Sequence, residues 1–299
     1  MIYPEEELLN LNHIGLIPGP GESMEAFSKR AAYCQTLKDH LSAELKTTFD
    51  ADPNDNPEIL KESNTRLSAL FDISPAWIPI FFSNYKLPFW QGGCAWIFQM
   101  TADSPTAALI QLRRTFQRAT HYLGIYEREE LLTHELAHTG RMAFNEPAFE
   151  EVFAYHSSHS SFRRWFGPIL QSSVESVIFV LMIGAILVVD VFLAALHHTD
   201  AYLAALWLKL IPLGFIGYGV WRLSRKHRQL KLCLSSLEKC LDDPSKALAV
   251  AYRLSDAEIR AFSKLSSKEI KDYAAEQAKK ELRWQVILKT YFLLTSESL

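Results

Sequence analysis

Two histidines and a glutamate in the stretch THELAHTGRM, residues 133–142, have types and spacing that suit metal-dependent chemistry. Residues four apart lie on one face of an α-helix, so His134 and His138 can direct their imidazoles at a common metal ion. Glu135 stands beside the same face, where its carboxylate can accept and return a proton. These three residues predict hydrolysis by water that a metal ion activates.

The flanking residues predict the helix that this spacing requires. The pattern H-E-x-x-H is typical of zinc hydrolases when it lies on a helix. Apolar residues recur at helical spacing from Ile125 to Phe144, no proline interrupts them, and charged residues gather at the front. We therefore predict a helix from about Glu127 to about Ala143. The alternative is a core helix whose histidines bond backbone carbonyls and whose glutamate faces solvent.

A catalytic zinc needs a third protein ligand, and the residues after this helix supply candidates. A histidine six residues further on, as in metzincins, is ruled out because Phe144 occupies that position. Beyond it, Asn145 can cap and Pro147 can open a second helix that carries Glu150 and Glu151. At about 1.5 Å per residue, a helix running back brings one of these carboxylates level with the histidines.

Of the two neighbouring acids, we favour Glu151 as the third ligand. Ala148 and Ala154 flank it at helical spacing, and their small side chains let two helices approach closely. Glu150 is the second candidate, and the alternative for either residue is an ordinary solvated acid. The weaker candidates are Glu146, His156 and His159.

Residues 127–156 resemble the gluzincins, zinc peptidases whose third ligand is a glutamate on a helix after H-E-x-x-H. Many of them read E-G-x-A there; this chain has Glu151-Val152-Phe153-Ala154, with valine for glycine, after a short connection. The resemblance implies a bound Zn2+, a peptide or protein substrate and an α+β zincin-like domain. Glu135 would take a proton from water and deliver it to the leaving amine. Tyr155 and Arg141 are candidate donors to the oxyanion.

The short run GGCAWIFQM, Gly92 to Met100, is predicted to be a strand because aromatic and apolar residues follow a glycine pair. In zinc peptidases that resemble this chain, an edge strand beside the active-site helix binds the substrate backbone. The run is a candidate for that role, and an ordinary core strand is the alternative.

Two long apolar runs predict insertion into a lipid bilayer. Val174 to Leu196 comprises 23 residues and Tyr202 to Trp221 comprises 20, and the linker between them suits only a hairpin turn. Asp190 and Lys209 lie at similar depth from that turn and are predicted to pair across it. A buried helical hairpin in a water-soluble protein is the competing architecture.

The charge pattern predicts both orientation and partners. Seven basic residues flank the outer ends of the hairpin, and the turn has none, so both termini and the active site are predicted to be cytoplasmic. The net charge of −3 and a first half without a basic run argue against nucleic acid as a partner. The acidic N-terminus shows no secretory signal, and four cysteines without C-x-x-C spacing indicate a reducing compartment and no cysteine zinc site. The basic residues are Arg163, Arg164, Arg222, Arg225, Lys226, Arg228 and Lys231.

Together these patterns predict a mainly α protein with three domains. Residues 1–165 would form the α+β zincin-like metallopeptidase domain, with a helix near Met24 to Thr47 and a polar loop, DADPNDNPE. Residues 166–222 would form the transmembrane hairpin. Residues 223–299 would form a helical cytoplasmic domain, with helix starts at Ser255 and at Ser266 or Ser267. Two other functions stay open: a non-catalytic membrane hairpin or scaffold protein, and a zinc hydrolase of a non-peptide bond.

Overall fold

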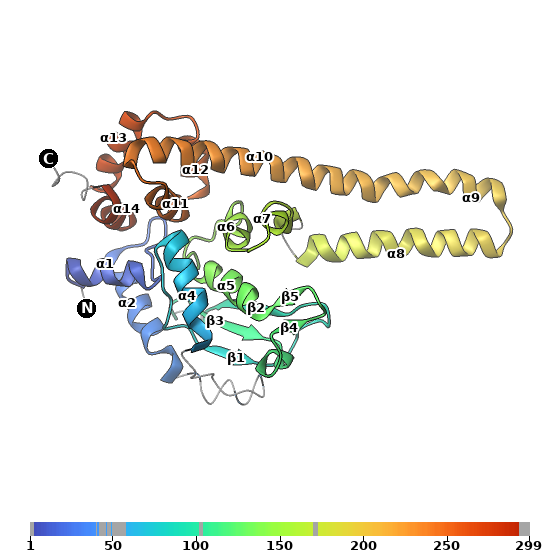
Figure 1. Cartoon of the computed structure of the whole chain (residues 1–299), viewed down its shortest axis with the longest axis horizontal. Coiled ribbons are helices and arrows are strands. Elements are labelled where there is room, and N and C mark those ends of the chain that lie inside the picture. Colours follow the sequence, from blue (N-terminus) through green and yellow to red (C-terminus); the bar gives the residue numbers. More distant parts are fainter. Residues whose placement is uncertain are drawn as a thin grey trace. The chain divides into compact units, whose positions relative to one another are not determined.

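A computed structural model describes residues 3–39, 41, 46, 49, 58–101, 104–169 and 173–292. The contacts divide the chain into two units (Figure 1). Unit 1 comprises Met1–His159 and Gln229–Leu299, and unit 2 comprises Ser160–Arg228. The described residues are mainly helical, as the sequence predicts, with a few short strands confined to unit 1.

The helices of unit 1 surround a small sheet. Its elements before unit 2 are α1 (Glu5–His13), α2 (Met24–Gln35), α4 (Glu58–Phe71), β1 (Ile80–Phe82), β2 (Gly93–Phe98), β3 (Ala107–Leu112), η1 (Arg114–Gln117), β4 (His121–Tyr122), β5 (Tyr126–Glu127), α5 (Arg128–Thr139) and α6 (Glu150–His156). After unit 2 come α11 (Pro244–Tyr252), α12 (Asp256–Phe262), α13 (Ser267–Gln277), α14 (Leu282–Ile287) and η4 (Leu288–Phe292).

The three-stranded sheet has the order β1-β3-β2, which leaves β2 at an edge. β3 pairs parallel with β1 and antiparallel with β2, so that Ile110 lies between Ile80 and Ala95. All six residues of β3 are buried, as expected of a central strand covered on both faces. Its one long polar side chain, Gln111, is satisfied there, because it donates to two carbonyls and accepts from the indole of Trp96 at 2.8 Å.

Residues 229–299 belong to unit 1 by their contacts, whereas the sequence patterns suggest a separate cytoplasmic domain. The side chain of Arg253 explains the difference. It is fully buried and donates to Asn12 Oδ1 at 2.7 Å, to the Phe71 carbonyl at 2.7 Å and to the Asp72 carbonyl at 3.2 Å. A buried guanidinium needs such acceptors, and the N-terminal half of the chain supplies them.

Several predicted element boundaries can be checked against the structure. The strand predicted at Gly92–Met100 is confirmed as β2. The helix predicted from Met24 begins there but ends at Gln35 rather than near Thr47. Residues 50–57 of the predicted polar loop lie outside the described residues, and its last residue, Glu58, begins α4. The predicted starts at Ser255 and Ser266 are confirmed, because each serine caps its helix in a capping box with a glutamate.

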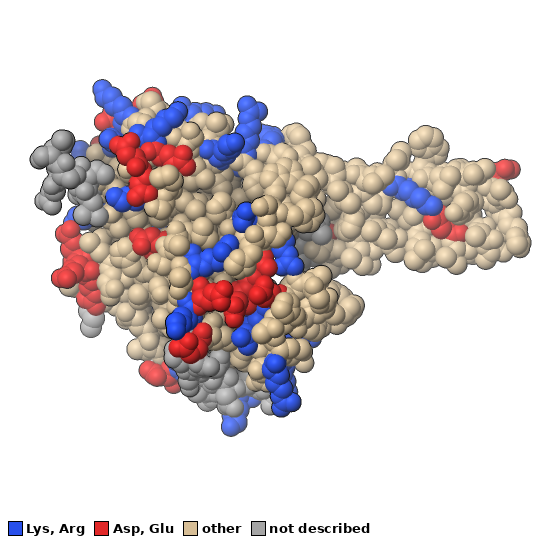
Figure 2. All heavy atoms as spheres, in the orientation of Figure 1, with Lys and Arg blue, Asp and Glu red and all other residues tan. Residues whose placement is uncertain are grey.

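Unit 2 is a helical hairpin with a short helix before it. Its elements are α7 (Ser161–Phe166), η2 (Gly167–Ile169), α8 (Ser173–Ala195), α9 (Thr199–Ala205), η3 (Leu206–Lys209) and α10 (Leu210–Leu241), the last of which continues into unit 1. Two helical stretches, Val174–Ala195 and Thr199–Leu241, are long and apolar enough to cross a membrane. No residue in the most apolar part of Val174–Ala195 is buried. Figure 2 shows the hairpin surface as mostly uncharged.

The predicted ion pair across the hairpin is confirmed. Lys209 Nζ lies 3.0 Å from a carboxylate oxygen of Asp190, and the same ammonium lies over the ring of Tyr202 at 5.5 Å from its centroid. The two helical arms therefore meet at a polar contact within otherwise apolar sequence.

Candidate metal centre

Two helices and the edge strand of unit 1 position the residues of the H-E-x-x-H pattern. The predicted helix is confirmed as α5, although it ends at Thr139, about four residues earlier than predicted, because Gly140 begins a series of turns. Asn145 then adopts a φ of 51°, the left-handed conformation that asparagine tolerates better than most residues. This turn reverses the chain, so Asn145 is not the helix cap that the sequence suggested. Phe149 precedes α6 instead, with no side-chain cap.

The two histidines and Glu151 form a compact group that could hold a metal ion. One ligand atom from each of His134, His138 and Glu151 lies within 4.8 Å of the others. The two Nε2 atoms are 3.4 Å apart, and each lies 3.6 Å from a carboxylate oxygen of Glu151. Ligands bound tetrahedrally at 2.0–2.1 Å would stand about 3.3 Å apart. The spacing thus suits a shared ion better than direct hydrogen bonds, which are shorter.

The outer nitrogens of both histidines are also held. His138 Nδ1 donates to Glu150 Oε1 at 3.0 Å, and His134 hydrogen-bonds the backbone of Ala154. Metal-binding histidines usually donate their second N–H to a carboxylate or a carbonyl, which fixes the ring orientation. Glu150, the second candidate for the third ligand, therefore lies behind His138 and outside the group of three.

Glu135 lies beside the group without belonging to it. Its side chain is nearly buried, with 9% of the residue exposed, and Oε2 accepts a hydrogen bond from the backbone N–H of Ala95 in β2 at 2.8 Å. Burial raises the pKa of this carboxyl, and the nearby Glu151 carboxylate adds to the effect. The edge strand and the H-E-x-x-H helix are thus joined at the residue predicted to transfer protons.

Burial and charge act differently on the two histidines. Burial lowers the pKa of His134 well below its usual value, and the neighbouring His138 lowers it further. Burial also opposes charge on His138. The hydrogen bond that His138 donates to Glu150 and the carboxylates of Glu151 and Glu135 outweigh this effect and raise the pKa of His138 to about 9. Three carboxylates around two imidazoles form a negative environment, which favours a bound cation.

The remaining candidates are placed as follows. Tyr155 lies against His134, with ring centroids 4.5 Å apart. Arg141 is buried away from the group and donates to the carbonyls of Tyr252 and Leu254, which are residues of the C-terminal segment. Three further candidates, Glu146, His156 and His159, lie outside the group of ligand atoms. Glu146 accepts a hydrogen bond from the backbone N–H of Asp256, and His159 contacts Arg66. His156 lies at the end of α6.

Sequence reasoning missed the supporting contacts of the site. The pair Glu150-Glu151 could have suggested one ligand and one supporting carboxylate, because adjacent helix residues point about 100° apart. No residue type signals the role of Ala95, since its backbone makes the contact. No family model, curated protein or solved structure matches this chain, so the argument for function rests on this geometry.

Proposed function

We propose that this protein is a zinc metallopeptidase, similar in its ligand pattern to the gluzincins, and that the hairpin of unit 2 anchors it in a membrane. The supporting observation is the group of His134, His138 and Glu151, with Glu135 beside it. Two imidazoles and one carboxylate are the ligands of several catalytic zinc sites. The same ligands also suit iron in oxygenases. A buried carboxylate that is not itself a ligand favours hydrolysis, because hydrolysis needs a base.

The residues of this chain would divide the work of peptide hydrolysis. When bound, zinc would lower the pKa of water and polarise the scissile carbonyl. Glu135 would accept a proton from the attacking water and deliver it to the leaving amine. Its raised pKa suits the second of these steps, since the carboxyl then holds the proton more readily. Tyr155, beside His134, is the side chain that we propose as donor to the oxyanion.

Among the described residues, no strand pairs with the edge of β2 that faces away from β3, and this edge supports a peptide as substrate. In an antiparallel pair, backbone groups of alternate residues face the partner strand and the others face away. The N–H of Ala95 bonds Glu135, so the backbone of Ala95 faces away from β3. By the same alternation, the backbone of Ile97 faces the same open edge. An extended peptide can pair with such an edge, which would bring its scissile bond toward Glu135.

The Glu135→Gln variant tests the catalytic proposal. Glutamine keeps the volume and can still accept from Ala95, but it cannot carry a proton. We expect zinc content and fold to be retained while hydrolysis of casein falls by about 10² to 10⁴. The matched control is Glu129→Gln on the same helix, which should leave the rate unchanged.

The outcomes separate the alternatives. Cleavage by Glu135→Gln as fast as wild type would contradict the mechanism even if zinc is present. A protein that holds no stoichiometric metal after mild purification would favour the non-catalytic scaffold. A zinc protein that hydrolyses esters or non-peptide amides, and not casein, would favour the other hydrolase. Elemental analysis distinguishes zinc from iron.

We further propose that unit 2 spans the membrane twice, with both termini and the metal centre on the cytoplasmic side. Two apolar helices with exposed surfaces and basic residues at both outer ends support this arrangement. His198→Cys in the turn should react with an impermeant thiol reagent in intact cells, whereas Lys268→Cys in unit 1 should not. Both positions are exposed. Labelling of Lys268→Cys from outside would overturn the topology.

The native cysteines are unsuitable reporters for that experiment. All four are free, Cys34, Cys233 and Cys240 are buried, and Cys94 is partly exposed. Burial raises the pKa of Cys34, Cys94 and Cys233 to about 12, which leaves little reactive thiolate. The introduced cysteines therefore supply the signal.

A further inference from the structure

At the base of the hairpin in unit 2, residues 160–169 and the start of α8 meet α10. This base combines a crevice, exposed aromatic side chains and a basic cluster, which comprises Arg225, Lys226 and Arg228. We propose that this base binds an anionic phospholipid, with an acyl chain in the crevice and the phosphate against the basic cluster. The inference rests on the proposed membrane insertion of unit 2 and is independent of the peptidase chemistry.

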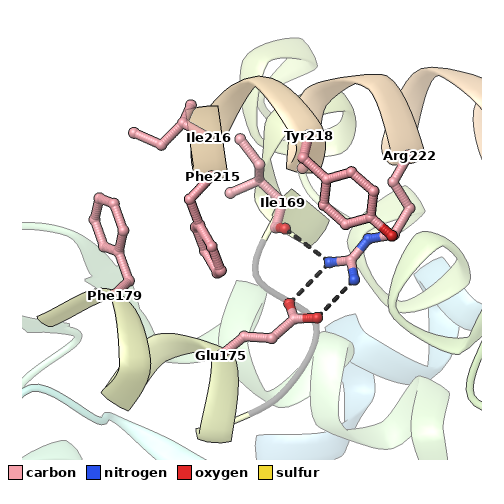
Figure 3. Close-up of a pocket in the computed structure, with 8 residues that line it drawn as sticks. Ile169, Glu175, Phe179, Phe215, Ile216, Tyr218 and Arg222 are labelled. Atoms are coloured by element: carbon pink, nitrogen blue, oxygen red, sulfur yellow. Dashed lines mark hydrogen bonds and ion pairs between the residues drawn. The ribbon is translucent and has the colours of Figure 1, made fainter. Parts of the chain in front are cut away.

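The crevice lies between α8 and α10 (Figure 3). Its volume is about 140 Å³, and its lining is almost wholly apolar apart from one ion pair. Phe179 and Phe215 stack across it with ring centroids 5.8 Å apart. The residues that line it are Ile169, Glu175, Phe179, Phe215, Ile216, Tyr218, Gly219 and Arg222.

Arg222 closes one end of the crevice but does not supply free charge. Its guanidinium pairs with both carboxylate oxygens of Glu175 at 2.6 and 2.8 Å and also donates to the Ile169 carbonyl at 3.3 Å (Figure 3). Such a two-bond pair neutralises the guanidinium and fixes its direction. We therefore assign Arg222 to holding α8 against α10, and the phosphate to other basic residues.

Those residues lie one helical turn further along α10. Positions three and four apart share a helix face, so the face that carries Phe215, Tyr218 and Arg222 continues through Arg225 and Lys226. Arg225 is exposed and lies over the ring of Trp221, 5.0 Å from its centroid. A lipid whose chain enters the crevice would thus have its phosphate near these cations.

Exposed aromatic side chains lie in the same part of unit 2 as these basic residues. α7 is joined to α10 by His227, whose ring stacks on Trp165 at 5.6 Å and hydrogen-bonds the Trp165 carbonyl at 3.1 Å. α7 exposes Phe162 and Trp165, and α10 exposes Trp221. Exposed aromatic residues next to basic ones are typical of the membrane interface.

The charge at this base is strongly one-sided. In residues 160–228 outside the Asp190–Lys209 pair and the turn, six residues are basic and only Glu175 is acidic. The six are Arg163, Arg164, Arg222, Arg225, Lys226 and Arg228. Such clusters beside a membrane span attract anionic lipids. A neutral phospholipid lacks the net negative charge that this excess of basic residues attracts.

Native mass spectrometry of the full-length protein tests the proposal, with phosphatidylglycerol and phosphatidylcholine of equal chain length as probes. We expect phosphatidylglycerol to be retained in preference, and the preference to fall with added salt. The triple variant Arg225→Gln/Lys226→Gln/Arg228→Gln should weaken phosphatidylglycerol binding by about fivefold per charge removed. The control Lys264→Gln/Lys268→Gln/Lys271→Gln removes the same charge from exposed sites of unit 1 and should not change it.

A second variant tests the crevice. Gly219→Leu adds a side chain in the crevice lining, where a Cβ would lie 3.3 Å from Ile169. We expect this variant to weaken the binding of both lipids while the ratio of their retention stays the same. The circular dichroism spectra of all variants must match wild type.

Equal retention of the two lipids by wild type, or an equal loss in both triple variants, would overturn the proposal. If casein cleavage is intact, either result contradicts only the lipid site and not the proposed peptidase activity. Loss of cleavage in Glu135→Gln with lipid preference retained shows that the two sites are independent, as proposed.

Discussion

Unit 1 buries the guanidinium groups of Arg253 and Arg283, whereas unit 2 exposes two-thirds of Val180 and of Leu181. Each of these two guanidinium groups donates to several acceptors, and apolar side chains of unit 1 fill much of the surrounding space. In unit 2 the charges are few and the apolar side chains point outward. Since exposed apolar surface of this extent is unfavourable in water, the difference between the units supports the proposal that unit 2 lies in a membrane.

Charged side chains are also arranged differently in the two units. At the candidate metal centre, one ligand atom from each of His134, His138 and Glu151 lies within 4.8 Å of the others. In the hairpin, Asp190 with Lys209 and Glu175 with Arg222 form closed pairs. Converging groups can bind an ion, whereas closed pairs hold helices together. Substitutions in the two kinds of cluster should therefore differ in their effects.

Removal of a ligand should have the largest effect. His134→Ala leaves two of the three ligand residues, and we expect loss of stoichiometric zinc and of measurable casein cleavage, because a catalytic zinc site needs three protein ligands. His156→Ala on α6 is the matched control and should retain both. Inductively coupled plasma mass spectrometry gives the metal content. Equal zinc in His134→Ala and wild type would show that the ion lies elsewhere.

Loss of the buried pair of Glu258 and Arg283 should lower the free energy of unfolding of unit 1. Glu258 accepts from Arg283 at 2.7 and 3.0 Å and from the indole of Trp284 at 2.6 Å. Glu258→Gln removes one of the two carboxylates that pair with this buried guanidinium and leaves Glu281, 2.9 Å from Nε, as the other. We expect a loss of about 3 kcal/mol in the free energy of unfolding, the lower end of the range for a broken buried pair. Glu269→Gln is the control, because Glu269 occupies the same capping-box position on an exposed helix. Urea denaturation measures both.

The same pair predicts a pH dependence. Burial favours the neutral form of Glu258, but the hydrogen bonds and charge of Arg283 outweigh it and lower the pKa of this carboxyl below 4.5. A lowered pKa in the folded state stabilises the protein at pH values above 4.5 and less as the pH falls through the folded-state value. The urea midpoint of wild type should therefore drop more steeply below pH 4.5 than that of Glu258→Gln. Parallel pH profiles would contradict the assignment.

Glu150→Gln should have a moderate effect on the metal centre. The amide can still contact His138 Nδ1 but no longer supplies a negative charge, and substitutions of such supporting groups weaken metal binding by about 10- to 100-fold. Glu151→Gln should weaken it more, because Glu151 lies within the group of ligand atoms. Competition with a zinc chelator measures both affinities. The reverse order would move the ligand assignment by one residue.

The pair within the hairpin should give the smallest effect. Asp190→Asn removes the counter-charge of Lys209, and polar contacts between membrane helices contribute on average about 0.6 kcal/mol and at most about 1.7. The exchange Asp190→Lys/Lys209→Asp should recover most of the loss. Unfolding in mixed detergent micelles measures the three proteins. A loss as large as that of Glu258→Gln would contradict the contrast between the two units.

The sequence determined the features that depend on local spacing. Helical periodicity predicted α5, and capping residues predicted the starts of α12 and α13. The spacing of His134 and His138 predicted that the two candidate ligands share one helix face. The choice of Glu151 over Glu150 also rested on local spacing, through the small residues beside it. Run length and depth from the turn were enough to predict that Asp190 meets Lys209. These features need no knowledge of distant contacts, because helix geometry fixes them.

Which distant segments meet depends on contacts that local sequence patterns do not encode. The joining of residues 229–299 to unit 1 depends on carbonyls that Asn12, Phe71 and Asp72 present to Arg253, and carbonyl groups leave no mark in a sequence. The contact of Glu135 with the backbone of Ala95 is of the same kind. The turns from Gly140 onward and the left-handed residue Asn145, which together bring α6 back against α5, were also not predicted from the sequence. Backbone groups are common to every residue, so the fold alone selects among them.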